Sequence, residues 1–307
     1  MKLKIAVIGA GAMGCLYGAY LARNRENVWL NDVWEKHITR INSRGLSVVS
    51  PDESFVAHPK ATSIVMEIGK ADLIIICLKT QFTAEGAVVA ETLAHSDSVI
   101  LTLQNGLGNA EQLAETLGPE RILVGESAMG AILLEPGHIM HGGLKTTHIG
   151  SFSGNNKRVQ EIAAIFNRSG LPTEVTPNVA SLLWSKVVIH AGINAVTAIT
   201  KATNGELLET PDALRLAELA VVEAQSVAKA LGIPLVYDDP IQQMRDFASA
   251  MRGHQSSMLQ DVKHKRHTEI DAINGMIVEE GRRIGVPTPV NESLTLMLRT
   301  IEQLGYR

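Results

Sequence analysis

The stretch Ile5-Ala6-Val7-Ile8-Gly9-Ala10-Gly11-Ala12-Met13-Gly14 joins an apolar, strand-like run to a glycine motif near the start of the 307-residue chain. The motif is a complete G-x-G-x-x-G after a strand pattern and before a helical one, which is typical of dinucleotide-binding folds. Its glycines permit a tight turn, close approach of a pyrophosphate and close helix packing, while the helix start offers N–H groups to phosphates. The alternative is a glycine turn that serves only chain reversal. The predicted cofactor-binding residues of this loop are Gly9, Ala10, Gly11, Ala12, Met13 and Gly14.

Asp32 stands at the end of the second predicted strand, close to the roughly 20-residue offset at which a carboxylate meets the adenosine ribose. A carboxylate there accepts hydrogen bonds from a 2′-hydroxyl and repels a 2′-phosphate, so the sequence favours NAD over NADP. Lys36 and Arg40 are near enough to weaken this preference. The alternative role for Asp32 is a cap for the helix that follows.

Two further segments end predicted strands at the edge where parallel sheets bind ligands. Lys79 is a candidate for contact with the cofactor or an anionic substrate, and Asn105 for contact with the nicotinamide ribose or the substrate. A solvated lysine and an Asn-Gly turn are the simpler alternatives.

The first half of the chain alternates short β-branched runs with helical patterns, which predicts a parallel sheet covered by helices on both faces. Residues 46–58 are predicted to form a hairpin insertion. We expect an α/β fold, with a Rossmann-type domain over 1–176 and an all-helical domain over 177–307. The predicted strands are Lys4–Ile8, Val28–Leu30, Leu73–Leu78, Val99–Leu103 and Ile122–Val124, and helices are expected to start near Ala12, Glu35, Thr83 and Ala110.

Bulk properties exclude several classes of protein. A formal charge of −4 gives no basic surplus for nucleic acid. Two cysteines make no disulfide framework, and no charged leader precedes the glycine motif, which favours a cytoplasmic protein. The longest apolar helix candidate, Val187–Ile199, falls short of the roughly 18 residues that a membrane span needs. The apolar C-terminal helices make a homodimer plausible.

Lys186, His190 and Asn194 are spaced by four on a strongly apolar helix, so they project from one face. Polar groups on such a face need partners, and a pocket wall supplies them. A satisfied core histidine and a lysine that extends its ammonium to water are the alternative.

The combined motifs resemble the ketopantoate reductase family (2-dehydropantoate 2-reductases) from Met1 to about Asn291. The last two motifs are long and specific. The segments that carry the resemblance are the glycine motif, Lys79-Thr80, Gln104-Asn105-Gly106, Leu183-Trp184-Ser185-Lys186, Asn194-x-x-Thr197-Ala198, Asn204-Gly205-Glu206-Leu207, Ser256-Ser257-Met258-Leu259-Gln260-Asp261 and His267-Thr268-Glu269-Ile270-Asp271-x-Ile273-Asn274-Gly275.

The resemblance implies a Rossmann domain joined to a helical domain, with the active site in the cleft between them. It implies that Lys186 is the general acid and that Glu269 contacts substrate and supports the chemistry. Lys79 matches a cleft lysine of the family. The residues that match substrate or supporting positions are Asn105, His190, Asn194, Asn204, Ser257 and Asp261.

These residue types suit the implied reaction. Hydride delivered to a 2-oxo carbon creates negative charge on oxygen, which a proton-donating ammonium stabilises. Asn and Ser donate to carboxylate and hydroxyl groups, and Glu269 can accept from a substrate hydroxyl. The alternative for Glu269 is a first-turn acid after a capping Thr268.

Two departures from the family pattern bear on specificity. His190 stands where the family usually has Asn, which puts the substrate or the hydrogen bonds around Lys186 in question. Residues 31–38 lack the arginine of NADPH-dependent members and are more similar to NAD-preferring D-2-hydroxyacid (mandelate-type) dehydrogenases. The basic run 263–267 is predicted to be a solvated helix face, and its two histidines lack further ligands, so no metal site is predicted.

The sequence therefore predicts reduction of 2-dehydropantoate to (R)-pantoate, a step towards pantothenate and coenzyme A, with NADH or NADPH. An NAD-dependent D-2-hydroxyacid dehydrogenase is the enzymatic alternative. A nicotinamide-sensing protein without catalysis is the third possibility, which retention of Lys186 and Glu269 argues against. The exact 2-oxo acid, the cofactor preference, the oligomeric state and allosteric ligands are not determined by the sequence.

Overall fold

The computed structural model describes residues 3–154 and 157–306, and the chain divides into two compact units. The first unit comprises Met1–Gln104 and Asn109–Val179, and the second comprises Asn105–Gly108 and Ala180–Arg307. A four-residue loop from the first half of the sequence thus belongs with the C-terminal half. The segment 105–108 follows a strand that ends at Thr102 and carries one of the predicted site residues, Asn105.

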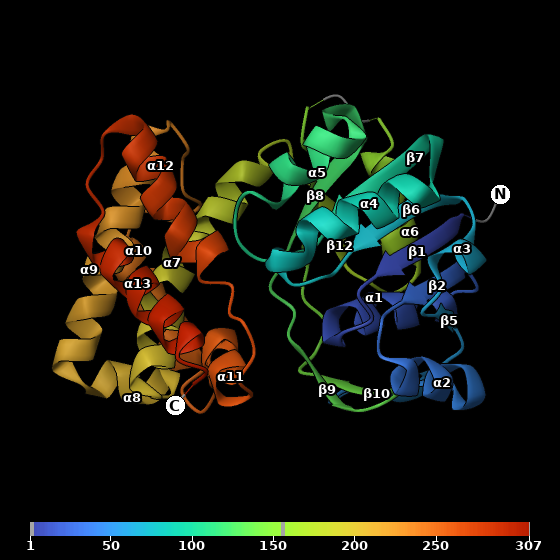
Figure 1. Cartoon of the computed structure of the whole chain (residues 1–307), viewed down its shortest axis with the longest axis horizontal. Coiled ribbons are helices and arrows are strands. Elements are labelled where there is room, and N and C mark those ends of the chain that lie inside the picture. The colour runs from blue at the N-terminus through green and yellow to red at the C-terminus, as the bar shows by residue number, and fades with distance from the viewer. Residues whose placement is uncertain (1–2, 155–156, 307) are drawn as a thin grey trace. The chain divides into compact units, whose positions relative to one another are not determined.

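An eight-stranded sheet forms the centre of the first unit, in the order β12-β11-β8-β7-β6-β1-β2-β5 (Figure 1). All neighbouring strands run parallel except β8 and β11. The order reverses between β1 and β6, and ligands of open α/β sheets bind at such a switch point. The strands are β1 Lys4–Ile8, β2 Asn27–Asn31, β5 Lys60–Thr62, β6 Ala71–Ile76, β7 Ala94–Thr102, β8 Ile122–Ser127, β11 Thr147–Ser151 and β12 Thr173–Val175.

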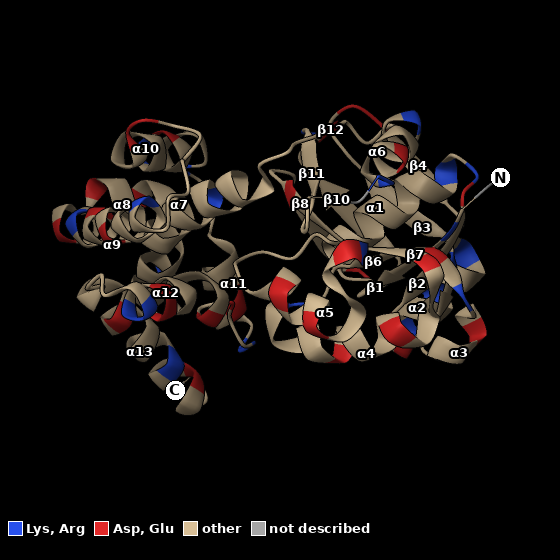
Figure 2. Cartoon of the chain, turned by 90° about the horizontal axis from the view of Figure 1, so that it is seen from above, with Lys and Arg blue, Asp and Glu red and all other residues tan. Residues whose placement is uncertain are grey.

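Helices cover both faces of this sheet, as the alternating pattern predicts (Figure 2). Helices α1 and α6 pack on one face, where the rings of Tyr17 and Phe166 lie 5.6 Å apart. Helices α4 and α5 cover the other face, and Figure 2 marks acidic positions along both of them. The elements are α1 Ala12–Arg23, α2 Glu35–Arg44, α3 Val65–Ile68, η1 Thr80–Phe82, α4 Thr83–Leu93, α5 Asn109–Leu117, η2 Pro119–Arg121 and α6 Val159–Arg168.

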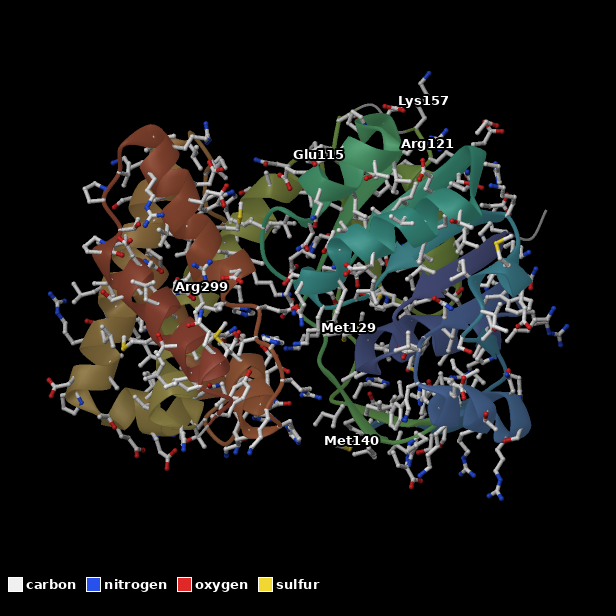
Figure 3. All side chains as sticks on the ribbon, viewed as in Figure 1. Glu115, Arg121, Met129, Met140, Lys157 and Arg299 are labelled. Carbon is white, nitrogen blue, oxygen red and sulfur yellow. The ribbon has the colours of Figure 1, made fainter. Side chains whose placement is uncertain are left out.

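A second sheet of four strands lies against α1, in the order β4-β3-β10-β9. The predicted hairpin insertion is confirmed, because β3 (Leu46–Val49) and β4 (Ser54–Ala57) pair antiparallel. The other hairpin, β9 (Ala131–Glu135) and β10 (His138–His141), was not predicted. Met140 of β10, labelled in Figure 3, is among the exposed side chains of this sheet.

The described residues of the second unit form helices and no strands, as the sequence predicts (Figure 1). Proline occupies the first turn of α9, α10 and α13, where its missing N–H costs nothing. A capping box between Thr203 and Glu206 starts α8. The elements are α7 Val179–Thr200, α8 Asn204–Glu209, α9 Pro211–Ala230, α10 Pro240–Ala250, α11 Ser257–Lys263, a π-helix η3 Asp271–Gly275, α12 Met276–Ile284 and α13 Pro289–Gln303.

Helix α7 is longer than predicted. It spans 22 residues, and an 18-residue window of mean hydropathy 1.4 is long and apolar enough to cross a membrane. The prediction that this helix is too short for a span is therefore wrong. However, 72% of that window is buried inside the structure, as in the core helix of a soluble protein.

Candidate active site

The glycine loop lies at the switch point of the main sheet, between β1 and α1. Gly9 has φ +93°, and a Cβ there would lie 3.0 Å from the backbone of Cys77. A Cβ on Gly14 would lie 2.0 Å from the carbonyl oxygen of Gly9, so the helix packs directly on the loop. Around a Cβ on Gly11 there is open space within 4 Å among the described atoms. These surroundings fit the three glycine roles of a dinucleotide loop.

The start of α1 supplies the anion-binding part of this loop. Gly11 is the N-cap of the helix, and its first turn has no acidic residue among its described positions. The first N–H groups of an α-helix have no partner within the helix and favour negative charge. The backbone of Ala12, Met13 and Gly14 is therefore suited to a pyrophosphate.

Asp32 is tied to the glycine loop. Its Oδ2 accepts a 2.9 Å hydrogen bond from the Ala10 amide, and its Oδ1 accepts a 3.0 Å bond from the Trp34 amide. The N-cap position of α2 belongs to Trp34, with Asp32 two residues earlier. Asp32 therefore holds the loop and the turn after β2, and the second lone pair of each oxygen is available to a ribose hydroxyl.

Lys79 follows β6 on the other side of the switch point. It is half-buried and is the N-cap of η1. Two residues earlier, the Cys77 amide donates to the Ile8 carbonyl at 2.8 Å, which holds this segment beside the end of β1. Lys79 thus extends from the same sheet edge as the glycine loop.

In the helical unit, α7 carries Lys186, His190 and Asn194, as the four-residue spacing predicts. Tyr237 fixes the turn that contains Lys186, because its hydroxyl donates to the Ser185 carbonyl at 2.6 Å. Lys186 and His190 are both half-buried. Burial, and then the positive charge of Lys186, lower the pKa of His190 to about 3, so its imidazole is neutral at neutral pH.

Two asparagines of this unit have buried polar atoms without a partner. Asn194 is 4% exposed and Asn204 is 3% exposed. Within residues 3–154 and 157–306, no hydrogen-bond partner is found for Nδ2 of Asn194 or for Oδ1 of Asn204. A buried polar group without a hydrogen bond costs about 1–3 kcal/mol.

Hydrogen bonds connect the segments that carry these residues. Ser256 Oγ lies 2.8 Å from Thr197 Oγ1 on α7, and the His254 carbonyl accepts from the Asn204 amide at 3.1 Å. The segment 254–256 therefore joins the end of α7 to the start of α8. Ser256 also caps α11, whereas the neighbouring Ser257 is exposed.

Glu269 is buried and precedes the π-helix η3. Its Oε2 accepts a 3.4 Å hydrogen bond from Asn105 Nδ2. Thr268 is not the N-cap of η3, because Ile270 holds that position. The Thr268 hydroxyl accepts from the Ile270 amide and donates to Glu302. The reading of Glu269 as a first-turn acid after a capping Thr268 therefore lacks support.

The π-helix is fixed to its surroundings by side chains. Asn274 Nδ2 donates to the Ala191 carbonyl of α7 at 3.0 Å. Arg299 Nε of α13 donates to Asp271 at 2.7 Å, and Figure 3 labels Arg299. The Leu107 amide donates to the Ala272 carbonyl at 2.9 Å. Extra turns of π-helix are frequent at functional sites. η3 thus connects the Asn105 loop to α7.

Asp261 differs from the other predicted substrate residues. It is 2% exposed, and its Oδ1 accepts from Arg266 Nε at 3.1 Å. Its carbonyl also accepts from the Arg266 amide. These bonds give Asp261 a structural role at the end of α11. The basic run 263–267 is exposed, as predicted, but α11 ends at Lys263, so most of the run lies beyond the helix. Within it, Arg266 pairs with Asp261 and His267 with Glu302.

Sequence reasoning missed several residues beside the predicted ones. Phe247 of α10 has its ring 5.9 Å from the His190 ring, and Trp34 stacks on His37. Gln104 Nε2 donates to Thr83 at 2.8 Å, which ties the segment before Asn105 to α4. These contacts join residues distant in sequence or lie outside the motifs, so no local pattern indicates them.

Comparison with known proteins identifies the family. Residues 5–154 match the family described as ketopantoate reductase PanE/ApbA, and residues 178–302 match its C-terminal region. The chain belongs to the ketopantoate reductase family. Both the α/β fold class and the resemblance that the sequence motifs indicate are thereby confirmed.

Individual relatives cover the whole chain. A 2-dehydropantoate 2-reductase of Halobacterium salinarum is 35% identical over 305 residues, covering 99% of this chain and 100% of the relative. A ketopantoate reductase structure from Ralstonia eutropha superposes with a TM-score of 0.92 at 30% identity, covering 100% of both chains. A D-mandelate dehydrogenase with NADH and anilino(oxo)acetate gives 0.91 at 28% identity, covering 99% of both.

Proposed function

We propose that this chain is an NAD(P)H-dependent 2-dehydropantoate 2-reductase, which reduces a 2-oxo acid to the (R)-2-hydroxy acid. The observation that carries the proposal is the pair of buried, unpartnered atoms Asn194 Nδ2 and Asn204 Oδ1 in the unit that also holds Lys186 and Glu269. Among the residues that the structure describes, this donor and this acceptor have no protein partner, and such a pair suits a ligand with carboxylate and hydroxyl groups. The names of the relatives support the same substrate.

The proposed roles follow from chemistry. When bound, the reduced nicotinamide supplies the hydride. Lys186 donates the proton to the oxygen that develops negative charge, a role that contributes roughly 10²- to 10⁴-fold in general acid catalysis. Glu269 accepts from the substrate hydroxyl, and Asn105 holds the Glu269 carboxylate in place. Asn194 and Asn204 orient the substrate, and the exposed Ser257 supplies a hydroxyl from the start of α11. Asp261 holds the end of that helix through Arg266.

For the cofactor, we propose NADH in preference to NADPH. The glycine loop and the start of α1 would hold the pyrophosphate, and Asp32 would bind the ribose hydroxyls. Lys79 would contact the cofactor from the opposite side of the switch point. The hydrogen bond from the Ala10 amide to Asp32 supports the preference for NADH, because it holds a carboxylate beside the glycine loop.

A D-2-hydroxyacid dehydrogenase acting on bulkier 2-oxo acids is the second candidate. The contact between His190 and Phe247 favours it, because two aromatic rings beside Lys186 suit an apolar or aromatic substituent. The similarity to D-mandelate dehydrogenase agrees with this.

We further propose a cytoplasmic location, in keeping with two free cysteines whose thiol pKa values burial raises. A homodimer is proposed only from the apolar C-terminal helices.

A substrate panel tests these proposals. Purified protein is assayed for oxidation of NADH and of NADPH with 2-dehydropantoate, phenylglyoxylate and pyruvate. The first proposal predicts the highest kcat/KM with 2-dehydropantoate and NADH. A preference for phenylglyoxylate would favour the second candidate, and no oxidation of either cofactor with any 2-oxo acid would contradict both.

A further inference from the structure

Trp34 presents an aromatic ring beside the proposed ribose-binding carboxylate. It lies two residues after Asp32, and the residue is 42% exposed. Its indole lies flat on the His37 imidazole, with ring centroids 5.3 Å apart and planes 9° apart. One face of the indole is therefore covered by His37, and the exposed area belongs to the rest of the ring.

His37 forms a fixed base for this stack. It is fully buried, and its Nδ1 accepts a 3.0 Å hydrogen bond from the Gly137 amide. Its Nε2 lies 3.3 Å from Cys15 Sγ in α1. Because Nδ1 accepts, the proton of the neutral imidazole is on Nε2. Burial lowers the pKa of His37, so the ring stays uncharged at neutral pH.

The backbone of Trp34 is held by the same carboxylate. Asp32 Oδ1 accepts from the Trp34 amide at 3.0 Å, while Oδ2 accepts from the Ala10 amide of the glycine loop. The position of the indole is thus fixed relative to both the loop and the ribose-binding group. In an adenine dinucleotide the base is attached to the ribose that Asp32 would bind.

We propose that the exposed face of Trp34 stacks on the adenine of the bound cofactor, making a column of imidazole, indole and adenine. The inference rests on the proposed dinucleotide-dependent function. Aromatic stacking on a base depends on its π-face, and removing the aromatic side chain weakens binding roughly 5- to 150-fold.

The test compares binding of cofactor fragments to purified full-length variants by calorimetry. In Trp34→Ala, affinity for NADH and for ADP-ribose should fall roughly 5- to 150-fold. Affinity for reduced nicotinamide mononucleotide, which lacks adenine, should stay unchanged. Trp34→Phe should keep affinity within a few-fold, because a phenyl ring also stacks. As a control, Val88→Ala removes an exposed apolar side chain of α4. It should leave the affinities for NADH and for ADP-ribose unchanged.

Two results would overturn the proposal. One is ADP-ribose affinity in Trp34→Ala within twofold of the wild type. The other is an equal loss for ADP-ribose and for reduced nicotinamide mononucleotide, which would indicate a general change of the loop. In either case, reduction of a 2-oxo acid by the wild type would leave the proposed function standing. A wild type that binds neither NADH nor ADP-ribose would contradict both.

Discussion

Asn105 and Glu269 are 164 positions apart in sequence and meet through a hydrogen bond of 3.4 Å from Nδ2 to Oε2. Asn105 belongs to the four-residue loop that packs with the helical unit, and Glu269 stands immediately before Ile270 and the π-helix. The amide thus faces a buried carboxylate. This contact is one of those that hold the Glu269 carboxylate.

Substituting Asn105 should reveal this relationship. Asn105→Asp places a second carboxylate beside Glu269, and repulsion between two like charges disfavours this arrangement. We expect KM for the 2-oxo acid to rise by about tenfold or more, and by less in Asn105→Ala. Steady-state kinetics of both variants measure this. Equal KM values for Asn105→Asp and the wild type would show that the contact has no role in substrate binding.

The glycine loop allows a matched pair of substitutions. A Cβ on Gly14 would lie 2.0 Å from the Gly9 carbonyl oxygen, so Gly14→Ala should destabilise the fold by about 1–3 kcal/mol and lower Tm by several degrees. A Cβ on Gly11 meets open space among the described atoms, so Gly11→Ala should leave Tm nearly unchanged while weakening NADH binding. Thermal melts and titrations of both variants check this. The opposite order of Tm values would contradict the packing argument.

Asp32 should determine the cofactor preference. Asp32→Ala removes an acceptor for the ribose hydroxyl and a negative charge that repels a 2′-phosphate. NADH affinity should fall roughly tenfold to 100-fold, while NADPH affinity falls less or rises. Asp52→Ala, at an exposed turn, serves as the control. If the ratio of the two affinities is the same before and after Asp32→Ala, the ribose assignment is wrong.

His190 should make stability depend on pH. Its pKa is about 3 in the folded protein and about 6.5 when unfolded, so between these values the unfolded chain binds a proton that the folded chain does not. Above pH 6.5, His190 therefore does not lower the free energy of unfolding. As the pH drops from 6.5 towards 3, the free energy of unfolding falls by at most about 1.4 kcal/mol per pH unit because of this group. His190→Asn should flatten the fall of Tm between pH 6.5 and 4. If the Tm of His190→Asn falls with pH as steeply as that of the wild type, His190 is protonated in the native state as readily as in the unfolded chain, and the prediction is wrong.

Much of the fold could be predicted from local patterns. The run Ile5–Ile8 and the glycine motif determine the first strand and helix, and the loss of strand patterns after Pro177 indicates the helical unit. Strands β5 and β12 have only three residues, too few for an alternating pattern to be recognised. The antiparallel pairing of β8 with β11 depends on long-range contacts, which local periodicity does not report.

The candidate site was predictable where helical spacing or a motif groups residues. The spacing of Lys186, His190 and Asn194 places them on one helix face, and α7 has this geometry. By contrast, the pairing of Asp261 with Arg266 and the contact of His190 with Phe247 arise from tertiary packing. Sequence spacing does not show which polar side chains form hydrogen bonds with residues elsewhere in the chain.

The measurement that tests the central claim most directly is the turnover of Lys186→Ala with saturating cofactor and 2-oxo acid. Loss of the general acid should lower kcat roughly 10²- to 10⁴-fold, while the Kd for NADH stays within a few-fold of the wild type. Lys229→Ala, an exposed lysine of α9, should leave both values unchanged. A Lys186→Ala variant with wild-type kcat would contradict the proposed role of this residue as the proton donor.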